Sequence, residues 1–302
     1  MIDSQRLCGS MPAMITPLND DYSVDTGAIA ALIEFFIDNG AHGVVVLGSS
    51  GEFQGIAYGQ RRRALAAAVA AAAGRIPVIG GAGLPNLWAT IEQIQEAADC
   101  GVDATLVTPP YYFPIGQDEI VDWFARLVEA SSLPILYYHF PVMTKLVAAP
   151  PTVRRLAECG VVGLKDSGGS TGWLHSALAA TASNPGFKVF IGGDGHLLDA
   201  LVNGGAGCIG LTQNVVPHIS AQLYDAYQAG DLASAEKYQR QAVEFSNQLN
   251  APPLGQPYAK AVLWKMGLCS PVVAPPMQRL SADAAEAAFA RVESHLRVPV
   301  RE

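Results

Sequence analysis

Short β-rich runs alternate with amphipathic or alanine-rich runs from the start of the chain to about residue 229. This alternation is typical of repeated βα units built around a parallel sheet. The β-rich runs cover residues 10–16, 43–47, 77–81, 104–108, 134–138, 161–165, 187–191 and 207–211. Because there are eight of them, the sequence predicts an α/β fold in which the strands close into a (β/α)8 TIM barrel.

Helical runs lie between the expected strands, and their pattern changes after Gly230. Several begin at Asp or Asn and end near Gly, as at residues 25–38, 86–100, 117–130 and 173–182. Beyond Gly230 the runs 231–250, 258–266 and 282–297 read as helices without intervening strands, separated by proline-rich breaks at 251–257 and 271–276. We therefore expect a catalytic barrel at 1–229 and a C-terminal helical extension at 230–302, packed on the barrel or on a neighbour.

The composition argues against a nucleic-acid partner. Half of the 302 residues are hydrophobic, 15% are charged, and the formal net charge is -8. Phosphate binding needs clustered Lys and Arg, and the only basic cluster is Arg61, Arg62 and Arg63. We expect these three to form one helical turn in a solvated or subunit-facing patch.

Cysteine usage and apolar runs indicate a soluble, cytoplasmic protein. The five cysteines, at 8, 100, 159, 208 and 269, are scattered, with no Cys-x-x-Cys pair and no His at metal-ligand spacing. Reduced thiols and no metal are expected. The first residues lack a basic region followed by an apolar stretch, and the longest apolar window, 64–73, is too short to cross a bilayer. No membrane partner is expected.

Lys165 is the most informative candidate for chemistry. It ends the apolar run 161–164, precedes a Gly/Ser turn, and is the one lysine of six whose local sequence reads as a core strand. Apolar surroundings favour the free, nucleophilic amine that Schiff-base formation needs. Strand alternation puts Val161, Gly163 and Lys165 on one face, and Gly163 would leave room for an inward lysine. The alternative is a strand-end lysine pointing to solvent.

Turn-forming residues cluster after three expected strands, at 48–51, 80–83 and 192–195. Barrel enzymes carry their chemistry in the loops at the carboxyl ends of the strands. The segment 48–52, Gly-Ser-Ser-Gly-Glu, could cradle a carboxylate with its hydroxyls and free N–H groups, or could be a simple turn that caps the next helix. Tyrosines at 111, 112, 137 and 138 could transfer protons or could pack the barrel mouth.

Together, these motifs resemble the dihydrodipicolinate synthase and N-acetylneuraminate lyase family. The motifs are GSSGE, TPPYY, YHFP and GLKDS, in that order, with the early MPAMITPL stretch and the GGAG segment. The resemblance covers nearly the whole chain. It implies a class I pyruvate-dependent aldolase or lyase on a (β/α)8 barrel with a C-terminal helical extension, assembled as a homotetramer from two dimers.

The resemblance also implies a role for particular residues. Lys165 matches the Schiff-base lysine, and Tyr138 matches the tyrosine that moves protons at the imine. Ser49 and Ser50 match the hydroxyl pair that holds the pyruvate carboxylate. Tyr111 matches a tyrosine that a dimer partner inserts into the relay, although Tyr112 remains an alternative. Gly193 and Ile209 match positions that line the pocket.

The chemistry implied by these residues needs no metal or nucleotide cofactor. The Lys165 amine attacks the ketone carbon of a 2-oxo acid such as pyruvate, and loss of water gives a protonated imine. The imine withdraws electrons, acidifies the C3 protons and permits carbon–carbon cleavage, addition or dehydration through an enamine. The direction of the reaction is left open.

Departures from the family pattern bear on the substrate. Similar dihydrodipicolinate synthases carry an arginine two residues after the YxxP proline, where this chain has Met143. Methionine cannot bind a carboxylate, and Lys145 would replace the arginine only as a flexible point charge. We therefore rank dihydrodipicolinate synthase second, behind an aldolase or lyase for a 2-keto-3-deoxy sugar acid or an N-acetylneuraminate-like acid. A hydratase-aldolase is a further alternative.

The YHFP run looks more like the lyases and sugar-acid aldolases, and two further positions match them. Asp194 matches an acidic residue that holds sugar hydroxyls, and Ser167 matches a hydroxyl beside the lysine. Gly195 and Leu211 replace polar residues of the lyases, which favours a shorter or more apolar acceptor. His139 is interpreted as a packed, hydrogen-bonded residue rather than a general acid.

Two other classes of protein remain possible. Residues 192–195 and 204–205 fall where phosphate-binding barrels hold phosphate, but a nearby cationic side chain is missing. A non-catalytic, ligand-binding barrel is the other, because a fold alone does not fix activity.

Overall fold

All eight expected strands are present in the computed structural model, which describes residues 6–249 and 255–296. Their bounds are β1 Gly9–Pro12, β2 Val44–Val46, β3 Val78–Ala82, β4 Ala104–Val107, β5 Ile135–His139, β6 Gly163–Asp166, β7 Lys188–Ile191 and β8 Gly207–Gly210. Six of them are shorter than the apolar runs that predicted them, and β3 and β5 have the predicted length but begin one residue later.

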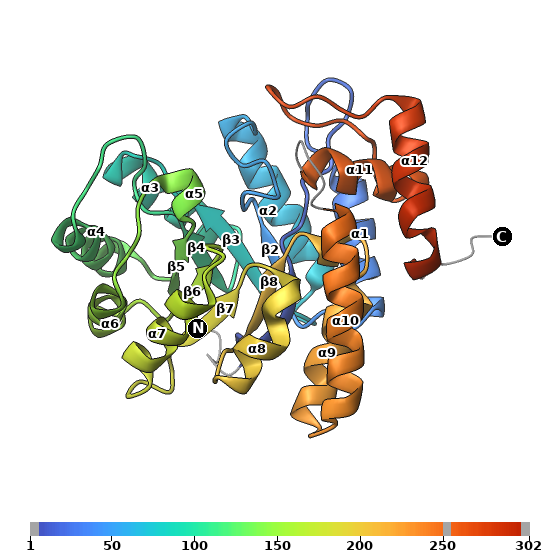
Figure 1. The fold of residues 1–302 in the computed structure, drawn as a ribbon. Helices are drawn as coiled ribbons and strands as arrows, with labels where there is room; N and C mark the ends of the chain where they lie inside the picture. The colour runs from blue at the N-terminus through green and yellow to red at the C-terminus, as the bar shows by residue number, and fades with distance from the viewer. Residues whose placement is uncertain (1–5, 250–254, 297–302) are drawn as a thin grey trace.

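The strands form one parallel ring. Their order is β1-β8-β7-β6-β5-β4-β3-β2, and each neighbouring pair is parallel. A parallel bridge between Ala13 and Val45 joins the end of β1 to β2, and the Met14 N–H donates to the Val45 carbonyl at 2.9 Å. The ring lies at the centre of the molecule with helices around it (Figure 1). The predicted (β/α)8 barrel is confirmed.

Within the described residues, nine α-helices follow the strands around the barrel, and three more form the C-terminal region. The first nine are α1 Thr26–Asp38, α2 Tyr58–Ala72, α3 Leu87–Asp99, α4 Gln117–Ala130, α5 Pro141–Thr144, α6 Pro150–Glu158, α7 Thr171–Thr181, α8 Leu197–Val202 and α9 Pro217–Gln228. The last three are α10 Leu232–Leu249, α11 Gly255–Lys265 and α12 Ala282–Val292, all within the described residues. Two expected helix ends, Asn250 and Arg297, lie outside those residues.

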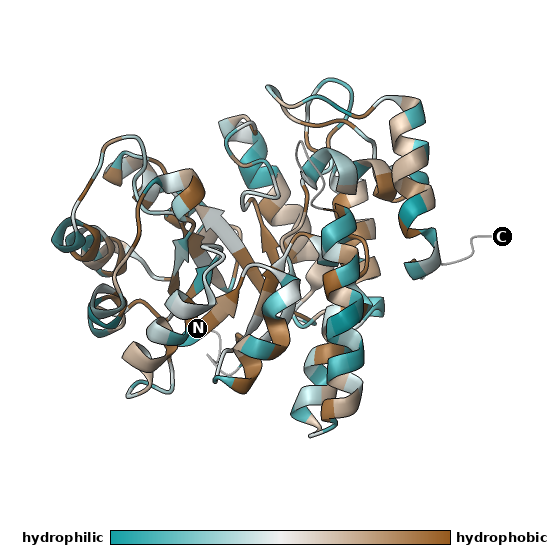
Figure 2. Ribbon diagram, viewed as in Figure 1, coloured by the Kyte–Doolittle hydropathy of each residue, from teal (hydrophilic) through white to brown (hydrophobic). Residues whose placement is uncertain are grey.

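Side-chain caps and apolar faces explain why the helices form where they do. Asp25 and Asn86 accept hydrogen bonds from the backbone N–H groups of Ala28 and Ala89, so α1 and α3 begin at the expected residues. The surrounding helices turn hydrophilic surface outward while the strands at the centre are largely hydrophobic (Figure 2).

The barrel separates an inner core from an outer one. The inner core is built from alternate strand residues, including Met11, Val45, Ile79, Leu136, Phe190 and Ile209. In β6, Lys165 faces this interior, whereas Leu164 packs in the outer core. The expected alternation fails before the strand begins, because Val161 packs in the outer core and Val162 against the inner one. Gly163 was expected to leave room for the lysine inside the barrel. The structure gives a different reason for a glycine, because a Cβ there would lie 2.4 Å from the Lys188 carbonyl oxygen.

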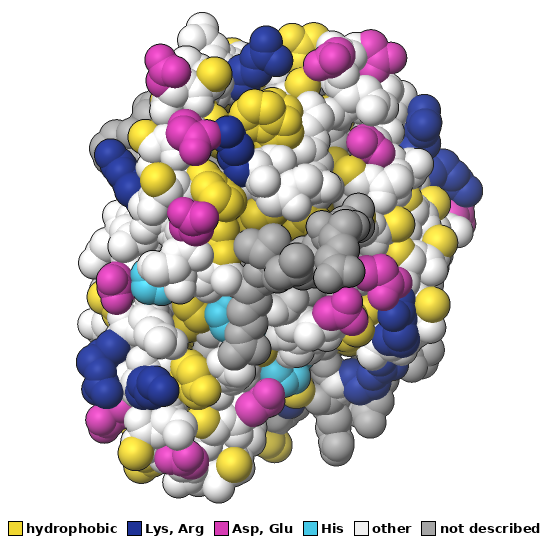
Figure 3. All heavy atoms as spheres, turned by 90° about the vertical axis from the view of Figure 1, so that its right-hand side faces the viewer, with side chains coloured by type: hydrophobic (Ala, Val, Ile, Leu, Met, Phe, Trp, Pro, Cys, Tyr) yellow, Lys and Arg dark blue, Asp and Glu magenta, His cyan; other side chains and the backbone are white. Residues whose placement is uncertain are grey.

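The C-terminal helices pack against the barrel. Phe245, Leu249 and Val262 share one apolar cluster with Phe36 and Val44, so the extension and the barrel form a continuous core. On the side of the molecule that carries α10 to α12, acidic, basic and apolar side chains are intermixed among the coloured residues (Figure 3). The division at residue 229 stays a proposal based on the change in sequence pattern.

The expectation for the basic cluster was wrong at one position. Arg62 and Arg63 are exposed, but Arg61 is buried and donates to the carbonyl oxygens of Gly81 at 2.9 Å and Phe53 at 3.4 Å. Burial lowers the pKa of the Arg61 guanidinium. Its side chain therefore ties α2 to strand β3 and to the loop after β2.

Gly81 in β3 is expected to be sensitive to substitution. A Cβ there would lie 2.1 Å from the Leu47 carbonyl oxygen, so Gly81→Ala must displace backbone at the end of β2. We expect the free energy of unfolding to fall by about 2 kcal/mol, measured by urea denaturation. Gly59→Ala is the control, because no atom lies within 4 Å of its Cβ position in α2. An equal loss in both variants would contradict the steric explanation.

Candidate active site

The candidate residues gather at one end of the barrel. All eight strands are parallel, so their carboxyl ends share one edge of the ring. Tyr138, Lys165 and Ile209 lie within strands β5, β6 and β8. The remaining candidates lie in the loops or short helices that follow the strands, namely Ser49, Ser50, Tyr111, Met143, Ser167, Gly193 and Asp194. The topology thus brings together segments that are far apart in the sequence.

Lys165 and Tyr138 are adjacent inside the barrel mouth. They are direct partners in the β5–β6 register, and the Lys165 Nζ lies 4.6 Å from the centre of the Tyr138 ring. Lys165 is only 5% exposed, and Tyr138 is also buried. Tyr138 stacks on Phe140 with ring centres 5.4 Å apart. The amine is therefore held in a largely apolar environment beside a phenol, an arrangement suited to imine chemistry.

A second polar cluster lies on the opposite face of the same two strands. The His139 Nδ1 lies 2.8 Å from the Asp166 Oδ1, which also accepts a hydrogen bond from the Gly168 N–H at 2.8 Å. The His139 ring stacks on Trp173 of α7 at 3.7 Å. Both polar side chains are buried. His139 is thus the packed, hydrogen-bonded residue that we expected, and it fixes the ends of β5 and β6 relative to α7.

Tyr137 completes this outer cluster. Burial, reinforced by the Asp166 carboxylate, raises the pKa of the Tyr137 hydroxyl. The Tyr137 hydroxyl, the His139 Nε2 and the Asp166 Oδ2 are buried, with no hydrogen-bond partner among the described residues. The outer cluster therefore stands apart from the face that Lys165 and Tyr138 present to the barrel mouth.

The loop that carries Ser49 and Ser50 adopts a constrained backbone. Leu47 and Glu52, at its two ends, have left-handed φ values of 60° and 57°. Such values cost energy for residues other than glycine, so surrounding contacts must hold the loop. The Thr16 hydroxyl donates to the Gly51 carbonyl at 2.6 Å, and both serines are half-buried. The backbone that carries the two hydroxyls is thus held in place after β2, as an anion site requires.

Asp194, in the loop after β7, makes structural contacts with the segment after β8. Its buried carboxylate accepts hydrogen bonds from Thr212, from the Gln213 Nε2 at 2.6 Å and from the Ser220 hydroxyl at 2.7 Å. These contacts favour a role in joining β7 to the segment after β8 over the expected role in binding sugar hydroxyls. Gly193 fits the expected pocket wall better, because its Cβ position meets no atom within 4 Å.

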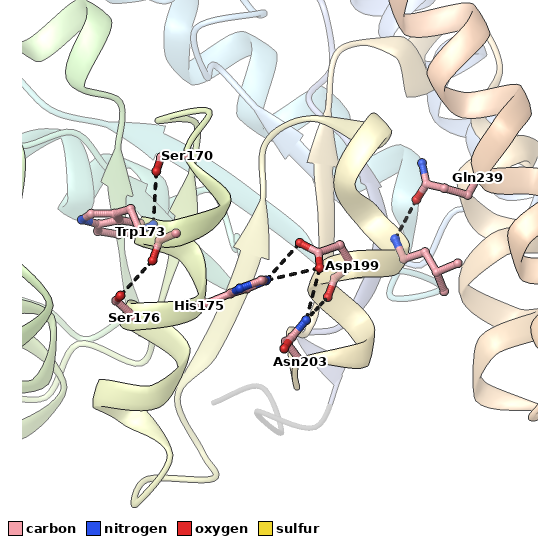
Figure 4. A network of polar contacts seen from close by, with 9 residues as sticks. Ser170, Trp173, His175, Ser176, Asp199, Asn203 and Gln239 are labelled. Carbon is pink, nitrogen blue, oxygen red and sulfur yellow. Dashed lines mark hydrogen bonds and ion pairs between the residues drawn. The ribbon is translucent and has the colours of Figure 1, made fainter.

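Helix α10 also holds this region in place. The Gln239 Nε2 donates to the Asp194 carbonyl at 3.0 Å, and the Gln239 Oε1 accepts from the Leu198 N–H at 2.7 Å. Beside it, His175 of α7 contacts Asp199 of α8, and Ser170 caps the start of α7 (Figure 4). The helices behind the β6 and β7 loops are therefore tied to one another and to the extension.

The two tyrosines after β4 have different surroundings. Tyr111 lines a surface cavity of about 300 Å³ together with Leu87 and Trp123, and burial raises the pKa of its hydroxyl. Tyr112 is 88% exposed, has a φ of 91°, and lies perpendicular to the Phe113 ring with ring centres 5.2 Å apart.

No charged side chain replaces the missing arginine in α5. Met143 is 60% exposed. The Lys145 Nζ, the expected substitute, donates to the Val142 carbonyl oxygen at 2.7 Å. This contact ties one donor of the exposed ammonium to the end of its own helix, so α5 offers exposed apolar side chains and a point charge but no bidentate carboxylate clamp.

Sequence reasoning missed a second buried lysine. Lys260 in α11 is fully buried and forms an ion pair with Glu52 at 2.6 Å. Lys165 is thus not the only lysine in a core environment, contrary to expectation. The apolar residues around Lys260, in the run Tyr258–Leu263, were a signal in the sequence that could have indicated its burial.

Within residues 6–249 and 255–296, no group of three or more His, Cys, Asp and Glu is arranged to hold a metal ion.

Comparison with known families agrees with this geometry. The model of the dihydrodipicolinate synthetase family matches residues 6–295. The chain belongs to this family. A family relative from Hyphomonas neptunium, named 4-hydroxy-tetrahydrodipicolinate synthase, is 37% identical over 91% of this chain and 94% of its own. Another, a probable 2-dehydro-3-deoxy-D-pentonate aldolase from Escherichia coli, is 32% identical over 76% of this chain and 78% of its own.

Solved structures of the family share the fold. A prophage protein from Escherichia coli K12, determined in complex with pyruvate, superimposes with a TM-score of 0.91 and 28% identity, covering 95% of this chain and 98% of that one. The chloride-inhibited dihydrodipicolinate synthase from Acinetobacter baumannii, also determined with pyruvate, superimposes with a TM-score of 0.88 and 26% identity. The match covers 96% of this chain and 99% of that one. The expected family, and with it the aldolase and lyase class of enzyme, is confirmed.

Among the described helices, none is both long and apolar enough to cross a bilayer.

Proposed function

We propose that the protein is a Schiff-base-forming aldolase that takes a 2-oxo acid such as pyruvate. The observation that carries this proposal is the buried Lys165 amine, 4.6 Å from the Tyr138 ring at the carboxyl end of the barrel. The family membership and the pyruvate complexes of two solved relatives support it.

In the proposed reaction the free amine of Lys165 attacks the ketone carbon, and the substrate carboxylate binds Ser49 and Ser50. Tyr138 donates a proton to the departing hydroxyl, so that water leaves and a protonated imine forms. In a 4-hydroxy-2-oxo acid, the bond between C3 and C4 then breaks as the C4 hydroxyl passes its proton to the Tyr138 oxygen, and the C4 fragment leaves as an aldehyde. The electrons of the broken bond form an enamine, which is protonated at C3 to an imine, and water hydrolyses that imine to pyruvate and free Lys165.

We propose that the acceptor aldehyde carries no carboxylate of its own, unlike aspartate semialdehyde. Met143 stands where an arginine clamp would be, and the Lys145 ammonium is tied to the Val142 carbonyl. A 2-keto-3-deoxy sugar acid or an N-acetylneuraminate-like acid fits this rim better than the product of aspartate semialdehyde. The aldolase relative from Escherichia coli supports the first choice.

The second candidate is 4-hydroxy-tetrahydrodipicolinate synthase, the name of the relative that is 37% identical. We expect pyruvate release from 2-keto-3-deoxy sugar acids, followed with a coupled dehydrogenase, to exceed condensation with aspartate semialdehyde at least about tenfold, because a charged carboxylate contact is missing. Faster condensation with the semialdehyde would reverse the ranking.

The proposal extends to the assembly and the setting of the enzyme. As in the family pattern, we infer a homotetramer built from two dimers, in which Tyr111 enters the neighbouring site. We also infer a cytoplasmic location.

Phosphate is a poor ligand for the loop after β7. The buried Asp194 carboxylate lies in that loop, and its negative charge would repel a phosphate.

A further inference from the structure

The backbone of residues 47–52 needs support from outside the loop. The left-handed φ values of Leu47 and Glu52 frame the two serines, and non-glycine residues keep such values only where surrounding contacts fix them. The turn itself contributes one hydrogen bond, from the Glu52 N–H to the Ser49 carbonyl at 3.1 Å. The Thr16 hydroxyl supports the loop at Gly51, and the position of the two serines also depends on what holds Glu52.

Glu52 is held by the C-terminal extension. One carboxylate oxygen lies 2.6 Å from the Lys260 Nζ, and the other accepts a hydrogen bond from the Ala274 N–H at 2.5 Å. The Lys260 Nζ also donates to the Val272 carbonyl at 2.7 Å. Both charged side chains are fully buried, so a glutamate in a barrel loop and a lysine in α11 compensate each other inside the core.

Two further contacts join the same partners. The Gln256 Nε2, at the start of α11, donates to the Ser49 carbonyl at 3.3 Å. A Cβ added to Gly55 would lie 2.6 Å from the Ala274 Cβ, so the loop and the segment after α11 are in close contact. The loop is thus fixed at Ser49, Glu52 and Gly55 by residues of the extension.

A buried ion pair by itself adds little to the free energy of unfolding, because the cost of desolvating two charges offsets most of their attraction. Burial lowers the pKa of the Lys260 ammonium, and the Glu52 carboxylate opposes that effect. A pair of this kind does impose a unique geometry, since displacing either charge leaves the other unpaired in the core.

We propose that Lys260 is a positioning residue, which acts through Glu52 to hold Ser49 and Ser50 where they bind the substrate carboxylate. The inference rests on the proposed function, and it makes the C-terminal extension a part of the carboxylate site. Lys260 touches neither substrate nor Lys165, so its loss should weaken binding of the 2-oxo acid and leave the reacting amine in place.

The test is borohydride trapping of pyruvate at increasing pyruvate concentrations, read by intact mass. For Lys260→Met, we expect the half-saturating pyruvate concentration to rise about tenfold or more, because displacement of binding groups by about 1 Å has effects of this size or larger. The fraction trapped at saturating pyruvate should stay at the wild-type level. The double variant Glu52→Gln/Lys260→Met carries no unpaired buried charge and should show the same rise.

Lys265→Met is the matched control. Lys265 lies in the same helix and pairs with Glu286 of α12, away from the loop. The half-saturating pyruvate concentration of the Lys265→Met variant should therefore equal that of the wild type. A wild-type half-saturating concentration in a folded Lys260→Met or double variant overturns the inference, even if the denaturation midpoint falls. Absence of any adduct in the wild-type protein overturns the proposed function instead.

A measurement on the wild-type protein covers the case in which the variants do not fold. Pyruvate should slow hydrogen exchange in residues 48–52 together with 258–262 and 272–274. Protection confined to the loop, with none in the extension, overturns the inference.

Discussion

Lys165→Ala is expected to lose activity by roughly 10⁴-fold or more and to form no borohydride-stable adduct with pyruvate. Removal of a catalytic nucleophile has effects of this size, because no other group can form the covalent intermediate. In the wild-type protein, borohydride should trap one pyruvate per chain, and peptide mapping should locate it at Lys165. Steady-state rates and intact mass measure the two effects.

Two variants control for effects on the fold. Lys165→Met keeps most of the side-chain volume at this buried position, so it should fold like the wild type and still form no adduct. Lys188→Ala removes the lysine that begins the neighbouring strand β7, at the opposite end of the barrel, and should be trapped normally. An adduct on Lys165→Ala, or normal rates in that variant, would end the Schiff-base proposal.

Tyr138→Phe is expected to lower kcat by about 10² to 10³-fold, because it removes the phenol that transfers protons at the imine. The variant should fold normally, since Phe keeps the ring that stacks on Phe140 and lies beside the Lys165 amine. Pyruvate should still be trapped on Lys165, but more slowly, and stopped-flow or quenched trapping measures that rate.

Tyr137→Phe is the matched control for this prediction. Tyr137 precedes Tyr138 in the same strand but faces the outer core, and its buried hydroxyl has no hydrogen-bond partner among the described residues. We expect activity within about threefold of the wild type, because the lost group lies on the face away from the amine. If the two variants lost activity equally, Tyr138 would have no special role in proton transfer.

Much of the barrel could be predicted because its pattern is local. Each strand appeared as a short apolar run, and the helix over residues 117–130 matched its predicted bounds. Strand ends were less accurate, since hydrogen bonding between strands stops where the chain turns away. The run 161–165 shows this, because β6 begins only at Gly163 and the residues before it do not follow its alternation.

The candidate site was predictable to the extent that it depends on strand ends. Parallel strands bring their carboxyl ends to one edge, so the positions of Tyr138 and Lys165 followed from the order of the motifs. Side-chain partners did not follow. Asp194 accepts hydrogen bonds from Thr212, Gln213 and Ser220, which depends on how the segment after β8 packs against the loop after β7.

The sequence by itself determined the eight-stranded barrel and the family, because hydrophobic periodicity and the order of the motifs can be read along the chain. It left open whether Lys165 faces the barrel interior or the solvent, and the tertiary structure decided that. Only the tertiary structure decided which charged side chains are buried together. Lys260 and Arg61 lie in helices whose sequences do not reveal what packs against them. A buried charge is tolerated only where a distant segment supplies its partner, and that pairing is set by how the whole chain packs.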